Sequence, residues 1–167
     1  MVDTQNLFNS CTNDKKTFET LKKLYLYTWN NTYKSMEESY LKIQDGKIFI
    51  NFDEIDDDYK YLGKFTTEEH AIFIYTESCN DKDQCLIILM HDKEFDVDYN
   101  LVGYFNIGIM LSYGRRSQFP EAKTVFIYEN QINVKSNSDL NKIIKDQLKV
   151  TTINPNFLKE VSKKIGK

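Results

Sequence analysis

The chain has 167 residues, of which 41% are hydrophobic, and it carries a formal net charge of −3. This length suits one domain that buries about two thirds of the surface of its unfolded chain. The hydrophobic fraction excludes a disordered chain, and the scarcity of Gly and Pro excludes a collagen-like or linker-like one. The mild negative charge gives no general attraction to nucleic acid, so a nucleic-acid partner is disfavoured.

The start of the chain, MVDTQNLFNSC, has neither the basic segment nor the apolar run of a secretory signal. No apolar run reaches the ~18 residues that a membrane-spanning helix needs. We therefore expect a cytoplasmic protein. The odd number of cysteines then favours free thiols at Cys11, Cys79 and Cys85, although Cys79 and Cys85 flank a polar turn and could face each other across a hairpin.

The first 22 residues are expected to form an N-terminal helical segment, because Phe18, Leu21 and Leu24 recur at helical spacing. This helix would plug or flank the structure that follows. From Leu24 onward the apolar residues alternate with polar ones, which is typical of half-buried strands.

Residues 23–134 contain about eight such strands, separated by short polar turns and without a crossover helix between them. The sheet should therefore be antiparallel throughout. The clearest turn is Asp45-Gly46, which suits a two-residue type I′ hairpin because both central residues need positive φ. An up-and-down β-barrel is the simplest closure, since it removes exposed edges, and a two-sheet sandwich is the alternative.

The stretch Leu101–Tyr128 reads as two apolar strands joined by a polar loop, and it is expected to close the barrel. Residues 135–167 then return to helical spacing. Ser136 or Ser138 can cap a first helix, and Asn154-Pro155 can start a second one. This region carries a net charge of +5, from eight lysines against three carboxylates. We expect its helices to pack on the barrel or close one of its mouths, or else to dock on a partner, which could be a protein, nucleic acid or lipid.

The only two arginines, Arg115 and Arg116, lie side by side in the loop between those last two strands. A guanidinium fork binds carboxylates and phosphates in a bidentate way that lysine cannot copy, so this pair is the candidate anion-binding site. Trp29, Tyr104 and Tyr113 are candidates for the wall of the same pocket, because Trp and Tyr combine apolar area with a polar tip. Tyr25 and Tyr40 belong to the same tyrosine-rich set, which has eleven members.

Three segments together resemble lipocalin-like (calycin) domains: YLYTWNNTY, the hairpin YLKIQDGKIFINF, and GYFNIGIMLSYGRRSQFPEAKTVFIY. The resemblance covers about residues 22–130 and implies a single small β-barrel. The chain departs from the lipocalin pattern at Thr28, which precedes Trp29 where many lipocalins have Gly-x-Trp. No ligand and no site residue is therefore carried over from that family.

We expect a non-enzymatic barrel that binds or senses a small anionic, amphipathic or nucleotide-like ligand, in an enclosed pocket of roughly 300 Å³ or more that opens near residues 112–120. The alternative is a protein-interaction module, such as an immunity, inhibitor or viral accessory protein, that acts through a charged surface. The chain shows no phosphate loop, no complete set of metal ligands and no activated nucleophile, so neither a cofactor nor a metal is expected.

Overall fold

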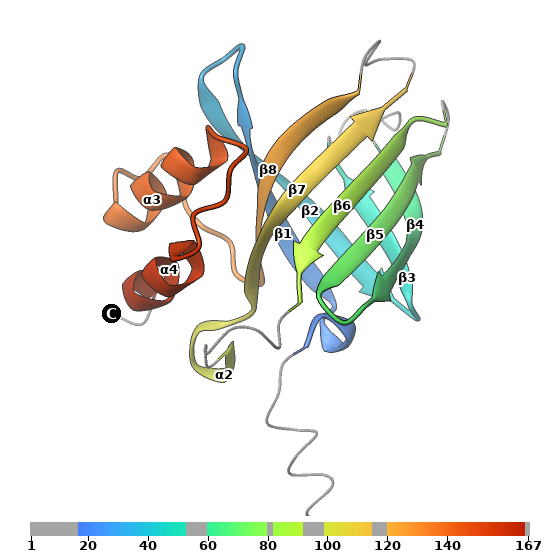
Figure 1. The fold of residues 1–167 in the computed structure, drawn as a ribbon, viewed down its shortest axis with the longest axis horizontal. Helices are drawn as coiled ribbons and strands as arrows, with labels where there is room; N and C mark the ends of the chain where they lie inside the picture. Colours follow the sequence, from blue (N-terminus) through green and yellow to red (C-terminus); the bar gives the residue numbers. More distant parts are fainter. Residues whose placement is uncertain (1–16, 53–59, 80–81, 92–98, 115–119, 166–167) are drawn as a thin grey trace, which may run out of the picture.

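The structure is a computed structural model that describes residues 17–52, 60–79, 82–91, 99–114 and 120–165 (Figure 1). In chain order its elements are the 3₁₀ turn η1 (Phe18–Thr20), β1 (Lys23–Asn30), β2 (Ser35–Gln44), β3 (Lys47–Asn51), β4 (Lys60–Thr67), β5 (Ala71–Ser78), β6 (Gln84–Met90), α2 (Tyr99–Val102), β7 (Phe105–Tyr113), β8 (Glu121–Tyr128), α3 (Asp139–Leu148) and α4 (Phe157–Ile165).

The eight strands form a closed antiparallel barrel in which each strand pairs with its sequence neighbours. The closing pair is β1 with β8, where Tyr25 lies opposite Tyr128 and Tyr27 lies opposite Phe126. The predicted up-and-down barrel is therefore confirmed, and the sandwich alternative is wrong. The predicted closing hairpin is β7 with β8.

The hairpin between β2 and β3 forms as its sequence predicts. Asp45 and Gly46 are the two residues of the turn, and their φ angles are 52° and 74°. Glycine adopts this conformation without steric cost, and aspartate tolerates it better than most residues do. The turn sets the register of the two strands, so that Gln44 lies opposite Lys47.

The interior of the barrel is packed with aliphatic side chains over the half nearer η1 and through the middle. Alternate residues of each strand point inward. The inward side chains of these layers are exposed by only 0–1%, and they are Leu24, Leu26, Leu41, Ile48, Ile50, Ile72, Ile74, Ile87, Leu89, Val125 and Ile127. The described side chains therefore fill the barrel at this depth.

The expected N-terminal helix is not supported: over residues 17–22 the chain forms only the single turn η1, and residues 1–16 lie outside the described residues. Thr17 and Thr20 cap each other: the backbone N–H of Thr17 donates to Oγ1 of Thr20, whose hydroxyl donates back to the carbonyl of Thr17. Leu21 is already extended, with φ −80° and ψ 154°, which ends the turn. Leu24 belongs to β1, where the apolar period is two.

Phe18 of η1 closes this end of the barrel. The side chain is 1% exposed, and its ring centroid lies 5.0 Å from that of Phe65 and 6.3 Å from that of Tyr104. Edge-on contacts of this kind add to the stabilisation from burial. One aromatic residue of this turn therefore closes the end of the barrel that a helix was expected to close.

The two C-terminal helices lie against the outside of the barrel, beside β8 and β1 (Figure 1). Their apolar side chains face the strands, as the edge-on contact between Phe157 and Phe126 shows, with ring centroids 5.7 Å apart. The predicted cap of the first helix is confirmed at Ser138, whose hydroxyl accepts the N–H of Asn141. Among the helices of the described residues, none has the length and apolar character needed to cross a membrane.

Phe18→Ala should lower the free energy of unfolding by about 3–5 kcal/mol, because the cavity at the closed end cannot collapse against rigid strands. Urea unfolding followed by Trp29 fluorescence measures this change. Tyr33→Ala is the matched control, since Tyr33 is 77% exposed and its loss should cost less than about 0.5 kcal/mol. Equal effects of the two substitutions would show that Phe18 does not seal the barrel.

Candidate functional site

The described residues of the predicted site lie in three separate places. Trp29 points to the outside of β1, where Nζ of Lys149 lies 4.7 Å from its ring centroid. Tyr104 is fully buried at the η1 end, packed on Phe18 and Tyr99. Tyr113 is 59% exposed at the far end of β7. The structure therefore does not bring these three aromatic side chains together.

The two arginines of the predicted anion site, Arg115 and Arg116, lie outside the described residues. The predicted opening near residues 112–120 falls largely outside them as well. The arginine site remains a prediction. The described residues offer a different recess, which no single stretch of the sequence indicates.

This recess, the lateral groove, lies on the wall of the barrel and has a volume of about 510 Å³. That volume is within the range of small-molecule sites, roughly 300–1,000 Å³. Strands β1, β2 and β3 and the segment after β8 supply its lining, which consists of Lys23, Tyr25, Glu38, Ser39, Tyr40, Asn51, Phe52 and Gln131.

The groove exists because two neighbouring strands differ in length. Strand β2 has ten residues and β3 has five, so the β3 ladder stops where Asn51 pairs with Tyr40. Within the described part of the chain, the remaining half of β2 pairs only with β1. Ser39, on the inward side of β2, also contributes to the lining, so the recess reaches the edge of β2 itself.

A row of polar aromatic side chains forms the floor of the groove. Tyr25, Tyr40 and Asn51 lie opposite one another on adjacent strands and on the same outer face. The side-chain amide of Asn51 donates to the hydroxyl of Tyr40 over 3.0 Å, and Asn51 is only 5% exposed. This bond fixes the edge of the Tyr40 ring while leaving both tyrosines half-buried, with part of their surface open to a ligand.

Lysine side chains supply the positive charge of the groove. Nζ of Lys23 lies 5.0 Å from the ring centroid of Tyr25 and 4.7 Å from that of Tyr40. Nζ of Lys42, directly opposite Lys23 in the register, lies 5.4 Å from the Tyr40 ring. An ammonium group held over an aromatic face gains about 0.5–1 kcal/mol at an exposed site, so these cations remain free to move toward an anion.

The opposite wall is a fixed hydrogen-bond network around Glu38. One carboxylate oxygen accepts the hydroxyl of Tyr27 over 3.0 Å, and the other accepts the amide of Gln131 over 2.7 Å. The Tyr27 hydroxyl also accepts the backbone N–H of Ile132 over 2.8 Å. Burial and the nearby Glu38 carboxylate raise the pKa of Tyr27 well above its ordinary value, so this phenol stays protonated and continues to donate.

Sequence reasoning included Tyr25 and Tyr40 in the tyrosine-rich set but missed Lys23, Asn51 and Gln131. The groove residues come from four segments that meet only through the strand register. A signal existed in the unequal lengths of the two strands around Asp45-Gly46, which predicts that the first half of β2 extends beyond β3. Locating Gln131 required the path of the chain after β8.

Other reactive side chains do not converge on the groove. His70 and His91 do lie at the same end of the barrel, where the backbone N–H of His91 donates to the carbonyl of His70 over 3.3 Å. Among the described residues, no cluster of three or more His, Cys, Asp or Glu side chains could hold a metal ion. Cys79 and Cys85 are both free thiols, one exposed and the other buried.

The chain was compared with protein-family models, with curated proteins and with solved structures, and none of them matches it. The closed eight-stranded antiparallel barrel agrees with the lipocalin-like resemblance at the level of architecture. A barrel of this kind hosts many unrelated functions, so the site carries the functional argument.

Cys85 should resist thiol reagents in the native protein. Burial raises the pKa of its thiol to about 12, so the thiolate fraction at pH 8 is about a thousand times smaller than for an ordinary cysteine. The double variant Cys11→Ser with Cys79→Ser retains only Cys85, and Cys11→Ser with Cys85→Ala retains only Cys79. With 5,5′-dithiobis-(2-nitrobenzoic acid), the first variant should therefore label far more slowly than the second.

Native labelling of Cys85 should accelerate as the pH rises from about 9 toward 12, because the thiolate forms only as the raised pKa is approached. In denaturant the two variants should label equally fast. Equal rates without denaturant would contradict the buried position of Cys85.

Proposed function

We propose that this protein is a non-enzymatic small-ligand-binding barrel, and that its ligand is a small planar anion of the nucleotide-like class. The observation that carries this proposal is the lateral groove, a recess of about 510 Å³ lined by two half-buried tyrosine rings and Lys23. Lys42 lies beside it, over the Tyr40 ring. Ligand pockets typically combine aromatic surface with a few placed polar groups. The groove has this combination.

The groove residues suit a ligand that has two parts, a flat ring system and an anionic group. The faces of Tyr25 and Tyr40 suit a flat ring system, since stacking of a base on an aromatic side chain contributes about 1–3 kcal/mol. Lys23 and Lys42 lie beside the same rings and suit a phosphate or carboxylate attached to that ring system. Asn51, the partner of Tyr40, holds the floor in place before a ligand arrives.

Binding is favoured over catalysis by the state of the polar groups around the groove. Both oxygens of the Glu38 carboxylate already accept hydrogen bonds, so this group orders the wall instead of moving a proton. Ser39 is the only hydroxyl of an aliphatic side chain in the lining, and the lining includes neither a histidine nor a cysteine. A serine nucleophile needs an adjacent base, which the lining does not supply.

A second function, binding of a protein partner, is favoured by a different surface. The apolar stripes of α3 and α4 are buried against the barrel, so the basic C-terminal helices present mainly lysines outward. The outer face of β4–β7 instead exposes large apolar side chains, among them Leu62, Tyr75 and Tyr113.

Adenosine monophosphate is the probe for the lateral groove. In a titration followed by amide NMR shifts, the largest changes should lie at Tyr25, Tyr40 and Asn51. Lys23→Gln and Tyr40→Leu should each weaken binding about tenfold, the equivalent of about 1.4 kcal/mol, because each removes one of the two contact types. Adenosine and ribose 5-phosphate should each bind more weakly than the complete nucleotide.

Lys82→Gln and Tyr33→Leu are the matched controls, since both residues are exposed away from the groove. Arg115→Ala with Arg116→Ala separates this site from the predicted arginine site. The groove assignment would be wrong if the arginine pair abolished binding while Lys23→Gln had no effect. Native mass spectrometry of the purified protein would identify a natural ligand that is retained.

A further inference from the structure

A second surface of the barrel, the apolar outer face, is formed by outward side chains of four adjacent strands. In the register Leu111, Leu86 and Tyr75 lie side by side on β7, β6 and β5, and the next outward row is Ile109, Ile88 and Phe73. Leu62 and Tyr113 extend the face at its upper rim. The apolar outer face is thus Leu62, Phe73, Tyr75, Leu86, Ile88, Ile109, Leu111 and Tyr113.

These side chains are open to solvent to a degree that is uncommon for large apolar residues. Tyr113 is 59% exposed, Leu62 54%, Tyr75 48% and Leu111 38%. The rings of Phe73 and Tyr75 are nearly parallel, with centroids 6.2 Å apart and planes 15° apart, so they form one contiguous aromatic cluster. Contiguous apolar surfaces of this kind mark interaction sites in soluble proteins.

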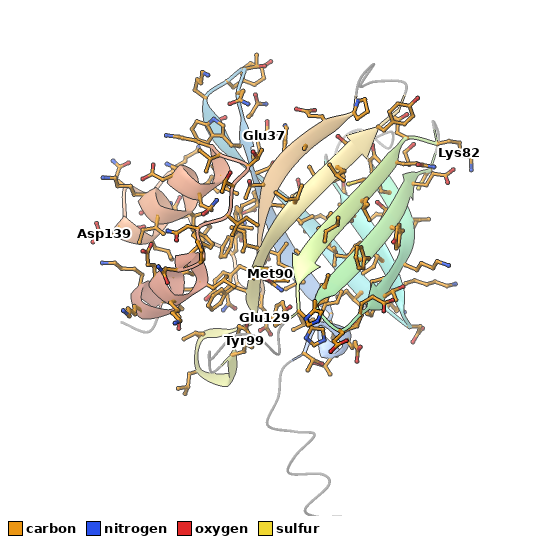
Figure 2. The ribbon with its side chains drawn as sticks, viewed as in Figure 1. Glu37, Lys82, Met90, Tyr99, Glu129 and Asp139 are labelled. Atoms are coloured by element: carbon orange, nitrogen blue, oxygen red, sulfur yellow. The ribbon has the colours of Figure 1, made fainter. Side chains whose placement is uncertain are left out.

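On another part of this barrel, helices cover a similar apolar outer surface. On β7 the outward residues Phe105 and Ile107 are fully buried, whereas Ile109 and Leu111, further along the same face, are not. The buried part continues onto β8 and β1, where the amphipathic helices α3 and α4 lie. In Figures 1 and 2 these helices lie to the left of the barrel, while β5 and β6 face the viewer with no helix in front of them.

Charge borders the apolar outer face on one side. Lys64 lies directly opposite Tyr75 in the register, and Lys47 lies opposite Lys64 on the next strand. Both lysines are exposed on the same outer face as the apolar residues. Among the described residues, Glu77 at the rim of this face is paired with Lys82 over 3.4 Å. The described charge along the Lys64–Lys47 border is therefore positive, and it suits an acidic partner.

We propose that the apolar outer face binds an amphipathic helix of a partner protein, with an apolar stripe and a flank of Asp or Glu. From β4 to β7 the face spans three strand spacings, about 14 Å, which one helix of about ten residues can cross at 1.5 Å per residue. The helix stripe packs on Phe73, Leu86 and Ile109, and its carboxylates meet Lys64 and Lys47. A second copy of this chain that presented the same face would bring the same lysine border, and its lysines would repel Lys64 and Lys47.

The test uses a fluorescein-labelled 18-residue helical peptide with a leucine stripe flanked by glutamates, and a matched peptide with lysines in their place. Fluorescence anisotropy should show the acidic peptide binding at least about tenfold more tightly, since opposite charges across an interface attract and like charges repel. Tyr75→Ser with Leu111→Ser should abolish that binding, and Lys64→Glu should weaken it while leaving the fold intact. Tyr33→Ser is the control with unchanged affinity.

Several outcomes would overturn the proposal. Equal affinity for the two peptides, or binding that survives both Tyr75→Ser with Leu111→Ser and Lys64→Glu, would exclude this face as an acidic-helix site. Sedimentation equilibrium showing a dimer that Leu111→Ser dissociates would assign the face to a second copy. Tyr75-dependent binding to phosphatidylserine vesicles, without peptide binding, would assign it to a lipid surface. Lys23→Gln should leave peptide affinity unchanged, which separates this proposal from the lateral groove.

Discussion

The pairing of β8 with β1 is the constraint on which the rest of the structure depends, because both faces of this closing pair are apolar. Inward, Ile127 lies opposite Leu26; outward, Tyr27 lies opposite Phe126. Closure therefore buries one set of side chains and leaves the other exposed. An outer face this apolar must be covered, and α3 and α4 cover it with their own apolar stripes.

The chain must also travel from the end of β8 to α3, and this path shapes the lateral groove. The segment after β8 is attached to the barrel at Tyr27, whose hydroxyl accepts the N–H of Ile132 and donates to Glu38. The same attachment brings Gln131 to the edge of β2. One buried phenol thus joins the helix cover to the wall of the candidate site, so the groove depends on how the C-terminal helices are connected.

The sequence predicted the features that depend on local patterns. Asp45-Gly46 predicted the hairpin between β2 and β3, the alternation of apolar and polar residues predicted the strands, and Ser138 was one of the two predicted caps of α3. The N-terminal helix is not supported over residues 17–22, because a spacing of three between Phe18 and Leu21 also fits one 3₁₀ turn, and residues with the period of a strand follow at once. The site was harder to predict because β1 is apolar on both faces: Leu24 and Leu26 alternate with Tyr25, Tyr27 and Trp29, so period alone could not tell which set faces inward.

The two candidate surfaces proposed for this barrel lie on its outside, which the lipocalin-like resemblance does not imply. The lateral groove lies on β1–β3 and the apolar outer face on β4–β7, and a stripe of exposed lysines runs across the strands between them: Lys23, Lys42, Lys47 and Lys64. Adjacent strands are about 4.8 Å apart, and the Debye length at physiological salt is about 8 Å, so neighbouring lysines of this stripe interact. The two ends of the stripe lie three strand spacings apart, about 14 Å, so an anion bound at one end is largely screened from the other. The two surfaces are therefore chemically distinct and electrostatically separable, although one stripe of lysines joins them.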